Sequence, residues 1–283
     1  MVDSKNPPNP ETTTLPANPV QHLTQEPPVD RVLIVDTETT DLDIQRGQVI
    51  EVGAILYSVK HRTALQECST LIPADSNPAA HINRIKETAL RNITVELTHR
   101  GLAMLTDMAR EAELVVAHNA QFDKKWFGLP KNDEIPIPTL FNANGQPLSW
   151  VCTCHDFEWP KQTRPGQSLV HLALAHDIGV STAHRALTDC QLIAALFDRM
   201  ENLEEMFERA LRPKARFKAV VSYDDRNLAK QAGFQWFDER KSWERIMAVE
   251  DSQRLPFGVQ QLEQTEFIAR QLGHLKPNTS FPS

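Results

Sequence analysis

The chain has 283 residues, is 41% hydrophobic and carries a formal net charge of −7. This length suits one sizeable domain with a smaller one beside it. No apolar run approaches the roughly 18 residues of a membrane-spanning helix, so no membrane partner is expected. The four cysteines are too few for a disulfide scaffold and favour a reduced, cytoplasmic setting.

Residues 1–29 are expected to form a disordered tail. The first 30 residues hold seven of the 19 prolines and almost no large apolar side chains. Such a segment cannot bury enough apolar surface to offset its loss of conformational freedom. It also lacks the apolar core of a secretory signal.

Three apolar stretches follow at short intervals, RVLIVDTE, QVIEVGAILYS and ALQECSTLIP, and predict an antiparallel meander. The segment from His81 to Ala112 is then expected to be helical, because Leu102, Leu105 and Met108 recur at a spacing of three.

The next segment predicts a buried strand at Leu114–Ala117 and a helix with Asn119 as its N-cap. A polar, proline-containing loop should occupy residues 129–150. Two more helices are expected in SLVHLALAHDIGV and HRALTDCQLIAALFDRM. These elements predict an α/β domain, a mixed sheet with helices packed on it, over residues 30–205.

Two carboxylates, Asp36 and Glu38, stand at the end of the first apolar strand. Side chains alternate along a strand, so these two point to the same side. Neighbouring carboxylates beside a buried strand repel each other and lose hydration. A raised pKa or a bound cation would relieve both effects. On this stretch alone, Asp36 could equally well end the strand and begin a turn.

Two further acids follow apolar segments. Asp123 comes in the first turn of the helix after LVVA, and Asp189 shares one helical face with Ile193 and Leu196. That apolar face must point into the core, where an acid needs a partner. His184 lies five residues earlier, about 140° away on an ideal helix. It can join the same site only from the loop before the helix.

Four carboxylates and one histidine could therefore converge. Oxygen ligands suit Mg²⁺ or Mn²⁺ and argue against a zinc-finger-type site. Two such ions, about 3.5–4 Å apart, promote in-line displacement at phosphorus, one by activating a water and one by stabilising the leaving oxygen. In this scheme His184 takes the proton from the water as general base.

The motifs DTET, AHNAQFD and HRALTD resemble, in order, those of the DnaQ-like 3′–5′ exonucleases, the superfamily of RNase T and of the DNA polymerase III epsilon subunit. The five-residue spacing from His184 to Asp189 marks the DEDDh subgroup. The resemblance covers residues 31–200 and implies a ribonuclease-H-like mixed five-stranded sheet flanked by helices. It implies that Asp36, Glu38 and Asp189 hold one metal ion, that Asp36 bridges to a second ion held by Asp123, and that His184 is the base.

The resemblance also indicates substrate contacts. Family members contact the 3′-terminal nucleotide with residues after the first motif, which correspond here to Thr39, Thr40 and Leu42. Asp41 stands where the family often has glycine, a departure that concerns the turn beside the substrate and not the metal site.

Three residues around the second motif have two readings each. His118 and Asn119 could touch substrate, or could end the strand and cap the helix. Phe122 could stack on a base or belong to the core. Cys152 and Cys154 look like half of a zinc site, but no second Cys/His pair lies at zinc spacing. A buried strand end is therefore expected there.

The C-terminal part has a different charge. Residues 212–245 carry nine Lys/Arg and five Asp/Glu, a net charge of +4 that leaves −11 for the remainder. Residues 212–250 are expected to form a small α+β module that resembles a short motif of DNA-processing proteins, with its helix closed by Gly233. Residues 251–283 should form an amphipathic helix, roughly over 260–272, and a polar tail.

Trp236 and Trp243 flank a predicted turn, FDERK, in this module. They either form the core of a very small domain or place one ring where it can stack on a base. In the second case basic residues nearby would neutralise phosphates. These residues are Lys230, Arg240, Lys241 and Arg245.

The sequence thus predicts a metal-dependent 3′–5′ exonuclease that removes nucleotides from 3′ ends of single-stranded or frayed DNA. The alternatives are an RNase T-like or oligoribonuclease-like RNA-trimming enzyme, a phosphoesterase acting on nucleotides, and a non-catalytic adaptor. All five motif residues are present, which argues against the adaptor. The expected partners are nucleic-acid 3′ ends, with DNA ahead of RNA, and a DNA polymerase or repair complex.

Overall fold

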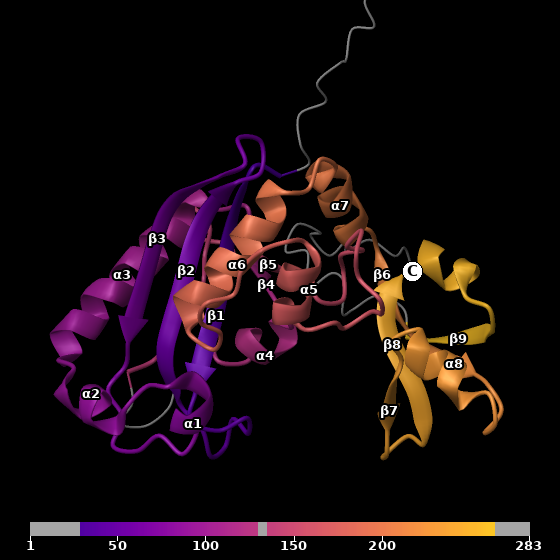
Figure 1. The fold of residues 1–283 in the computed structure, drawn as a ribbon, viewed down its shortest axis with the longest axis horizontal. Coiled ribbons are helices and arrows are strands. Elements are labelled where there is room, and N and C mark those ends of the chain that lie inside the picture. Colours follow the sequence, from indigo (N-terminus) through magenta and orange to yellow (C-terminus); the bar gives the residue numbers. More distant parts are fainter. Residues whose placement is uncertain (1–28, 130–134, 264–283) are drawn as a thin grey trace, which may run out of the picture.

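The structure is a computed structural model that describes residues 29–129 and 135–263. The predicted N-terminal tail, apart from its last residue, lies outside the described residues. None of the helices in the described part is long and apolar enough to cross a membrane. Two β-sheets organise the described residues (Figure 1).

The first sheet has five strands in the order β3-β2-β1-β4-β5. β1 (Arg31–Thr39), β2 (Val49–Ser58) and β3 (Thr63–Leu71) form the expected antiparallel meander. β4 (Leu114–Ala117) lies parallel to β1, and β5 (Ser149–Cys152) lies parallel to β4. The prediction of a mixed five-stranded sheet is confirmed.

Helices cover both faces of this sheet, which explains the unbroken apolar run at the start of β1. Val32 and Ile34 pack into one core with α5 (Leu169–Ala175) and α6 (Ala186–Asp198), whereas Leu33 and Val35 pack into a second core with α3 (Val95–Glu111). Each strand of the interior therefore needs apolar side chains on both sides. The acids at the end of β1 continue this alternation beyond the core.

The segment from His81 to Ala112 is largely helical, as expected, but it is broken into three helices. The pieces are α1 (Ala80–Asn83), α2 (Glu87–Asn92) and α3 (Val95–Glu111). Arg84 has a left-handed backbone with φ 60°, and Thr94 starts α3 by accepting a hydrogen bond from the Leu97 amide. A left-handed residue and a side-chain N-cap both interrupt helical hydrogen bonding.

Four more helices pack around the sheet. These are α4 (Ala120–Lys124), α5 (Leu169–Ala175), α6 (Ala186–Asp198) and α7 (Leu203–Ala210). α7 was not expected; it crosses the expected domain end at residue 205 and buries its apolar face in the same core as α6.

The second sheet forms what is called here the C-terminal module, residues 214–263. Its order is β7-β8-β6-β9, with β6 (Lys214–Val220), β7 (Gln235–Phe237), β8 (Ser242–Ala248) and β9 (Gly258–Glu263). β9 pairs antiparallel with β6. Residues 260–263 were expected to begin an amphipathic helix, but they instead satisfy the backbone edge of β6. The remainder of that predicted helix lies outside the described residues.

The helix of the module, α8 (Arg226–Gln231), ends as expected at Gly233. Gly233 has φ +79°, its amide bonds to the Lys230 carbonyl, and the Phe234 amide bonds to the Ala229 carbonyl. This is the Schellman pattern, in which a left-handed glycine closes a helix. A short 3₁₀ helix, η1 (Glu250–Arg254), joins β8 to β9.

Candidate active site

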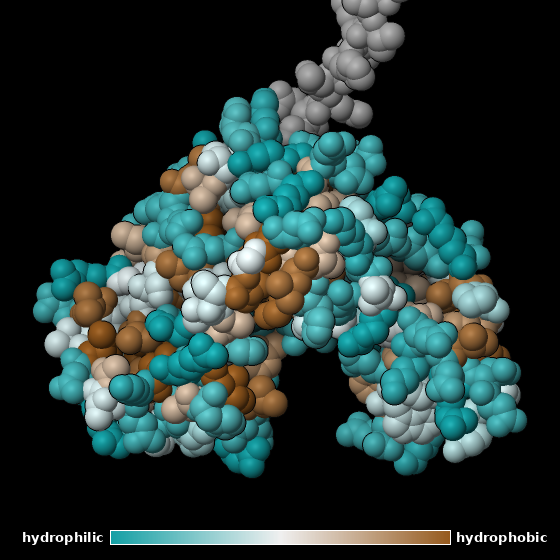
Figure 2. All heavy atoms as spheres, viewed as in Figure 1, coloured by the Kyte–Doolittle hydropathy of each residue, from teal (hydrophilic) through white to brown (hydrophobic). Residues whose placement is uncertain are grey.

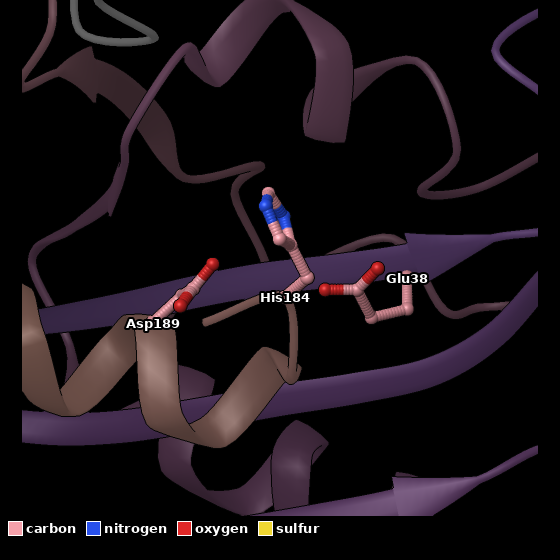
Figure 3. A group of neighbouring side chains, drawn as sticks. All are labelled: Glu38, His184 and Asp189. Atoms are coloured by element: carbon pink, nitrogen blue, oxygen red, sulfur yellow. The ribbon is translucent and has the colours of Figure 1, made fainter. Parts of the chain in front are cut away.

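Three of the five motif residues meet directly at the edge of the first sheet. Glu38 comes from the end of β1, Asp189 from the first turn of α6, and His184 from the loop before that helix. Each offers a ligand atom, and these atoms all lie within 4.8 Å of one another. In Figure 3 the Glu38 and Asp189 carboxylates point toward each other with His184 between them in the view.

Asp123 comes from α4 and lies against the end of β1. Its Oδ1 accepts hydrogen bonds from the Thr37 amide at 3.0 Å and from the Thr37 hydroxyl at 2.7 Å. Thr37 is the residue between Asp36 and Glu38, so this pair of bonds ties α4 to the acid-bearing end of β1. Asp36, Glu38, Asp123 and Asp189 are called the acid cluster below.

Burial raises the pKa values of these four carboxyls. Burial is the main cause that raises the pKa of Glu38 to about 8, of Asp123 to about 7 and of Asp189 to about 6. Burial also raises the pKa of Asp36 well above its usual value, and the charges of Asp123, Asp189 and Glu38 add to the effect. Four crowded carboxyls favour any positive charge placed among them.

The residues present fit a bound metal ion. Within the described part of the chain, Asp189 Oδ1 is buried without a hydrogen-bond partner. A buried carboxylate oxygen without a donor is costly, and a cation would satisfy it. Glu38 and Asp189 offer carboxylate oxygens close enough to hold one ion, and a ring nitrogen of His184 lies within the same 4.8 Å.

The N-terminal end of α6 is fixed to β2 by Glu51, a residue that the sequence reasoning missed. Glu51 is only 1% exposed, and its carboxylate accepts hydrogen bonds from Arg185 Nε at 2.9 Å, Arg185 Nη2 at 2.8 Å and the Ala186 amide at 3.1 Å. An added Cβ on Gly53 would lie 2.3 Å from the Leu187 amide nitrogen, so helix and strand touch there. The signal in the sequence was a glutamate inside the apolar run QVIEVGA.

Arg185 follows His184 directly, so the Glu51–Arg185 pair holds the loop that carries the histidine. His184 has a left-handed backbone, with φ 61°, and its side chain is exposed. The expectation that His184 lies on the loop before α6 is confirmed. Its imidazole can reach solvent while the backbone beneath it is anchored.

Comparison with known proteins agrees with this geometry. A family model described as "Exonuclease" matches residues 33–197. Over 174 residues the chain is 31% identical to DNA polymerase III subunit epsilon of Treponema pallidum (strain Nichols), which covers 58% of this chain and 74% of the relative. The chain belongs to the DnaQ-like 3′–5′ exonuclease family. It is therefore a phosphodiester hydrolase.

Two further likenesses are structural. The exonuclease resembles a 3′-exonuclease solved with a histone mRNA stem-loop, at 12% identity and a TM-score of 0.46, over 62% of this chain and 64% of that one. It also resembles E. coli ExoI in a zinc-bound complex with ssDNA, at 16% identity and a TM-score of 0.48, over 68% of this chain and only 48% of that one. Residues 215–262 match a separate family model, described as a domain of unknown function.

The predicted substrate contacts after the first motif of this exonuclease have different surroundings. Thr39 donates its hydroxyl to the Asp41 carbonyl at 2.9 Å, and Thr40 accepts from the Gln48 amide at 3.1 Å, so both shape the turn. Leu42 is 76% exposed. Asp41 does not have a positive φ, so its place where the family often has glycine imposes no backbone strain.

The predicted contacts around the second motif are partly structural. His118 Nδ1 lies 3.0 Å from the Thr153 hydroxyl and Nε2 lies 3.0 Å from the Gln167 carbonyl, and burial lowers the pKa of His118 to about 4. Asn119 is the N-cap residue of α4, as expected, but it has a left-handed backbone, φ 68°, and its side chain makes no capping hydrogen bond. Phe122 is half-buried beside the second core.

The four basic residues predicted to contact nucleic acid in the module differ from one another in their ion pairs and in their exposure. The Arg240 guanidinium is bound at both ends by Glu244, at 2.7 and 2.9 Å, and Lys241 lies 3.5 Å from an aspartate of the same turn. Lys230 is exposed on α8, and Arg245 is half-buried. Trp236 remains 45% exposed, and its ring lies 5.6 Å from that of Trp243. Their contact with nucleic acid stays a prediction.

Proposed function

We propose that this exonuclease removes nucleotides one at a time from 3′ ends of single-stranded or frayed DNA by two-metal-ion hydrolysis. The proposal rests on one observation, the convergence of the acid cluster with a histidine on an anchored loop. A structural ion-pair network would contain cations that neutralise the acids. Here the described surroundings instead leave four carboxyls crowded together.

Asp36, Glu38 and Asp189 would hold one Mg²⁺ or Mn²⁺ ion, and Asp36 with Asp123 would hold another. When bound, such ions supply an activated water and stabilise the leaving oxygen. His184 is placed to take the proton from the attacking water, because it is exposed and is not needed to fill the cluster. Thr39, Thr40 and Leu42 would then position the terminal nucleotide beside the cluster.

DNA is the favoured substrate because the 31% identical relative, which this chain matches over 74% of its length, is a subunit of a DNA polymerase. The same likeness makes a DNA polymerase or repair complex the proposed partner, in the cytoplasm. RNA trimming is the alternative outcome, since contacts to a 2′-hydroxyl separate the two substrates.

The test uses DNA and RNA oligomers labelled at either end, each with Mg²⁺, Mn²⁺ or EDTA. We expect a ladder of 5′-labelled DNA products, the release of labelled mononucleotide from 3′-labelled DNA, and no reaction in EDTA. The Asp36→Asn variant, prepared in parallel, is the matched control for contaminating nucleases. Cleavage from the 5′ end, or undiminished cleavage in EDTA, would refute the proposal.

A further inference from the structure

A cavity of about 510 Å³ lies between the exonuclease domain and the C-terminal module. One wall comes from the start of α4 and the end of β5, and the other comes from β6, β7 and β8. Figure 1 shows the module beside α4 and α5, and Figure 2 shows the molecule hollowed between these two parts. This volume lies within the range of roughly 300–1,000 Å³ that is usual for ligand sites.

The walls of this cavity carry more positive than negative charge. Five basic and two acidic side chains line it, although the whole protein has a formal charge of −7. The acidic ones are Asp156 and Glu244. The basic ones are Lys124, Lys125, Lys214, Arg216 and Arg245. Both walls contribute, so an anion in the cavity would be attracted from two sides.

One pair of these charged side chains joins the two walls of the cavity. Lys214 of the module forms an ion pair with Asp156 of the exonuclease domain at 2.6 Å, and both side chains are nearly buried. Gly233 packs on the same junction, because an added Cβ would lie 2.8 Å from a side-chain atom of Pro165. The cavity therefore has walls fixed relative to each other by contacts that do not involve its remaining cations.

The remaining cations have spare hydrogen-bonding capacity. Arg245 donates Nη1 to the Ala232 carbonyl at 2.7 Å, but its Nε is buried without a partner, and it forms no ion pair within the described residues. Arg216 lies 3.5 Å from Glu244, whose carboxylate already binds Arg240 at two shorter distances. A guanidinium has five donors, so each of these can still bind a phosphate.

α4 connects this cavity to the acid cluster. Asp123 of the cluster accepts a hydrogen bond from Thr37 of β1, while the adjacent Lys124 lines the cavity together with Asn119 at the start of the helix. Asp123 and Lys124 are consecutive residues, so the acid cluster and the cavity both adjoin this one short helix. A strand that ends at the cluster would need to extend only a short way to reach the cavity.

We propose that this cavity binds the sugar–phosphate backbone of the single strand whose 3′ end lies at the acid cluster. The inference rests on the proposed function, since it concerns the same substrate. Phosphates would meet Lys124 from one wall and Arg216 and Arg245 from the other. This grip offsets the repulsion between phosphate and the carboxylates of the cluster.

The test uses a cavity variant that combines Lys124→Gln and Arg216→Gln. Its matched control is a second double variant that combines Arg100→Gln and Lys218→Gln. Both pairs replace one lysine and one arginine. Lys218 lies on β6 two residues beyond Arg216, and Arg100 is exposed on α3; neither lines the cavity. Fluorescence anisotropy of a 5′-fluorescein oligo(dT) in EDTA, at several NaCl concentrations, measures affinity without cleavage.

We expect the cavity variant to lose at least about tenfold in affinity, which is the loss for a single charge-assisted contact. Its log–log salt slope should fall by roughly 1.4, because each phosphate contact to a single strand contributes about 0.7. Turnover of a dinucleotide should stay close to wild type, since this substrate is too short to occupy the cavity as well. The control variant should bind the oligomer as the wild type does.

Unchanged affinity and salt slope in the cavity variant, or an equal loss in the control, would overturn the inference. Because binding is measured in EDTA, this result is independent of whether the protein hydrolyses DNA, RNA or neither. Should the double variant melt early, Lys124→Glu alone decides the question, because Lys124 is exposed on α4. A normal melt with normal oligomer binding in that variant would also refute the proposal that the cavity binds the strand.

Discussion

Replacing Glu51 by Gln should show that the ion pair with Arg185 positions His184 for the reaction. The substitution keeps the shape of the side chain but removes the charge that accepts two hydrogen bonds from Arg185. Removing one partner of a fully buried pair costs about 3–5 kcal/mol. Arg185 is 39% exposed and can regain water, so we expect a smaller loss of about 2–3 kcal/mol in the free energy of unfolding.

This loss should lower the melting temperature by about 4–12 °C, given about 2–4 °C per kcal/mol for a domain of this size. kcat should fall by about 10- to 100-fold, since a displacement of about 1 Å in a catalytic group can cost 10²-fold. KM should change little, because the proposed substrate contacts, Thr39, Thr40 and Leu42, are untouched. The assay is steady-state release of nucleotides from labelled DNA, beside thermal melts.

Glu67→Gln is the matched control. Glu67 also contacts α6, accepting a hydrogen bond from Gln191 at 2.9 Å, but it is exposed and lies away from the histidine loop. We expect it to change stability by less than about 0.5 kcal/mol. A second check uses the His184→Ala background, where Glu51→Gln should cost little further activity if it acts through the histidine. Wild-type kcat in Glu51→Gln, or an equal loss in both backgrounds, would refute the positioning role.

Three further outcomes are expected. Asp36→Asn should abolish hydrolysis while its melt in EDTA stays within a few degrees of wild type or rises, because it removes a repelling charge; an early melt with retained activity would contradict this. His184→Ala should lower kcat about 10²–10⁴-fold, with metal affinity retained by calorimetry, because the proposed mechanism uses His184 as a base and not as a ligand. In EDTA the folded-state pKa values of Glu38, about 8, Asp123, about 7, and Asp189, about 6, exceed the ordinary carboxyl values of 4.5 and 3.8. The native state then binds more protons, so the free energy of unfolding should fall as pH rises from about 4 to about 8 and then level off; Mg²⁺ should reduce this fall, and urea melts at several pH values would show it.

The motif-bearing elements were predictable because each one combines a local apolar pattern with an acid at its end. VLIV before Asp36 and LVVA before Asp123 predict buried strands whose ends meet at one sheet edge. The position of His184 followed from helical geometry alone, since five residues on a helix would turn it away from Asp189. In the structure, His184 has a left-handed backbone and precedes the first residue of α6, Ala186, so it lies outside the helix.

What the sequence did not predict depends on contacts between distant segments. The break between α1 and α2 contains neither proline nor glycine; instead Ile85 and Leu90 pack on Ile50 of β2, and this tertiary contact replaces a continuous helix. β9 forms by pairing with the free edge of β6, and the local sequence pattern of residues 258–263 does not predict this pairing. Propensity is a weak guide wherever such contacts determine the backbone.

Glu51 and the basic cavity show the same limit at the functional site. A lone glutamate in an apolar strand predicts that some partner exists, but the partner, Arg185, stands 134 residues later in the chain. Likewise, Lys124 and Arg216 have ordinary local surroundings and gain a shared role only because the module packs beside α4. Short sequence motifs thus predict the residues of the acid cluster. The roles proposed for Glu51, Lys124 and Arg216 depend instead on contacts between segments that are distant in the sequence. Variants of Glu51, Lys124 and Arg216 should therefore alter positioning and binding while leaving the acid cluster itself in place.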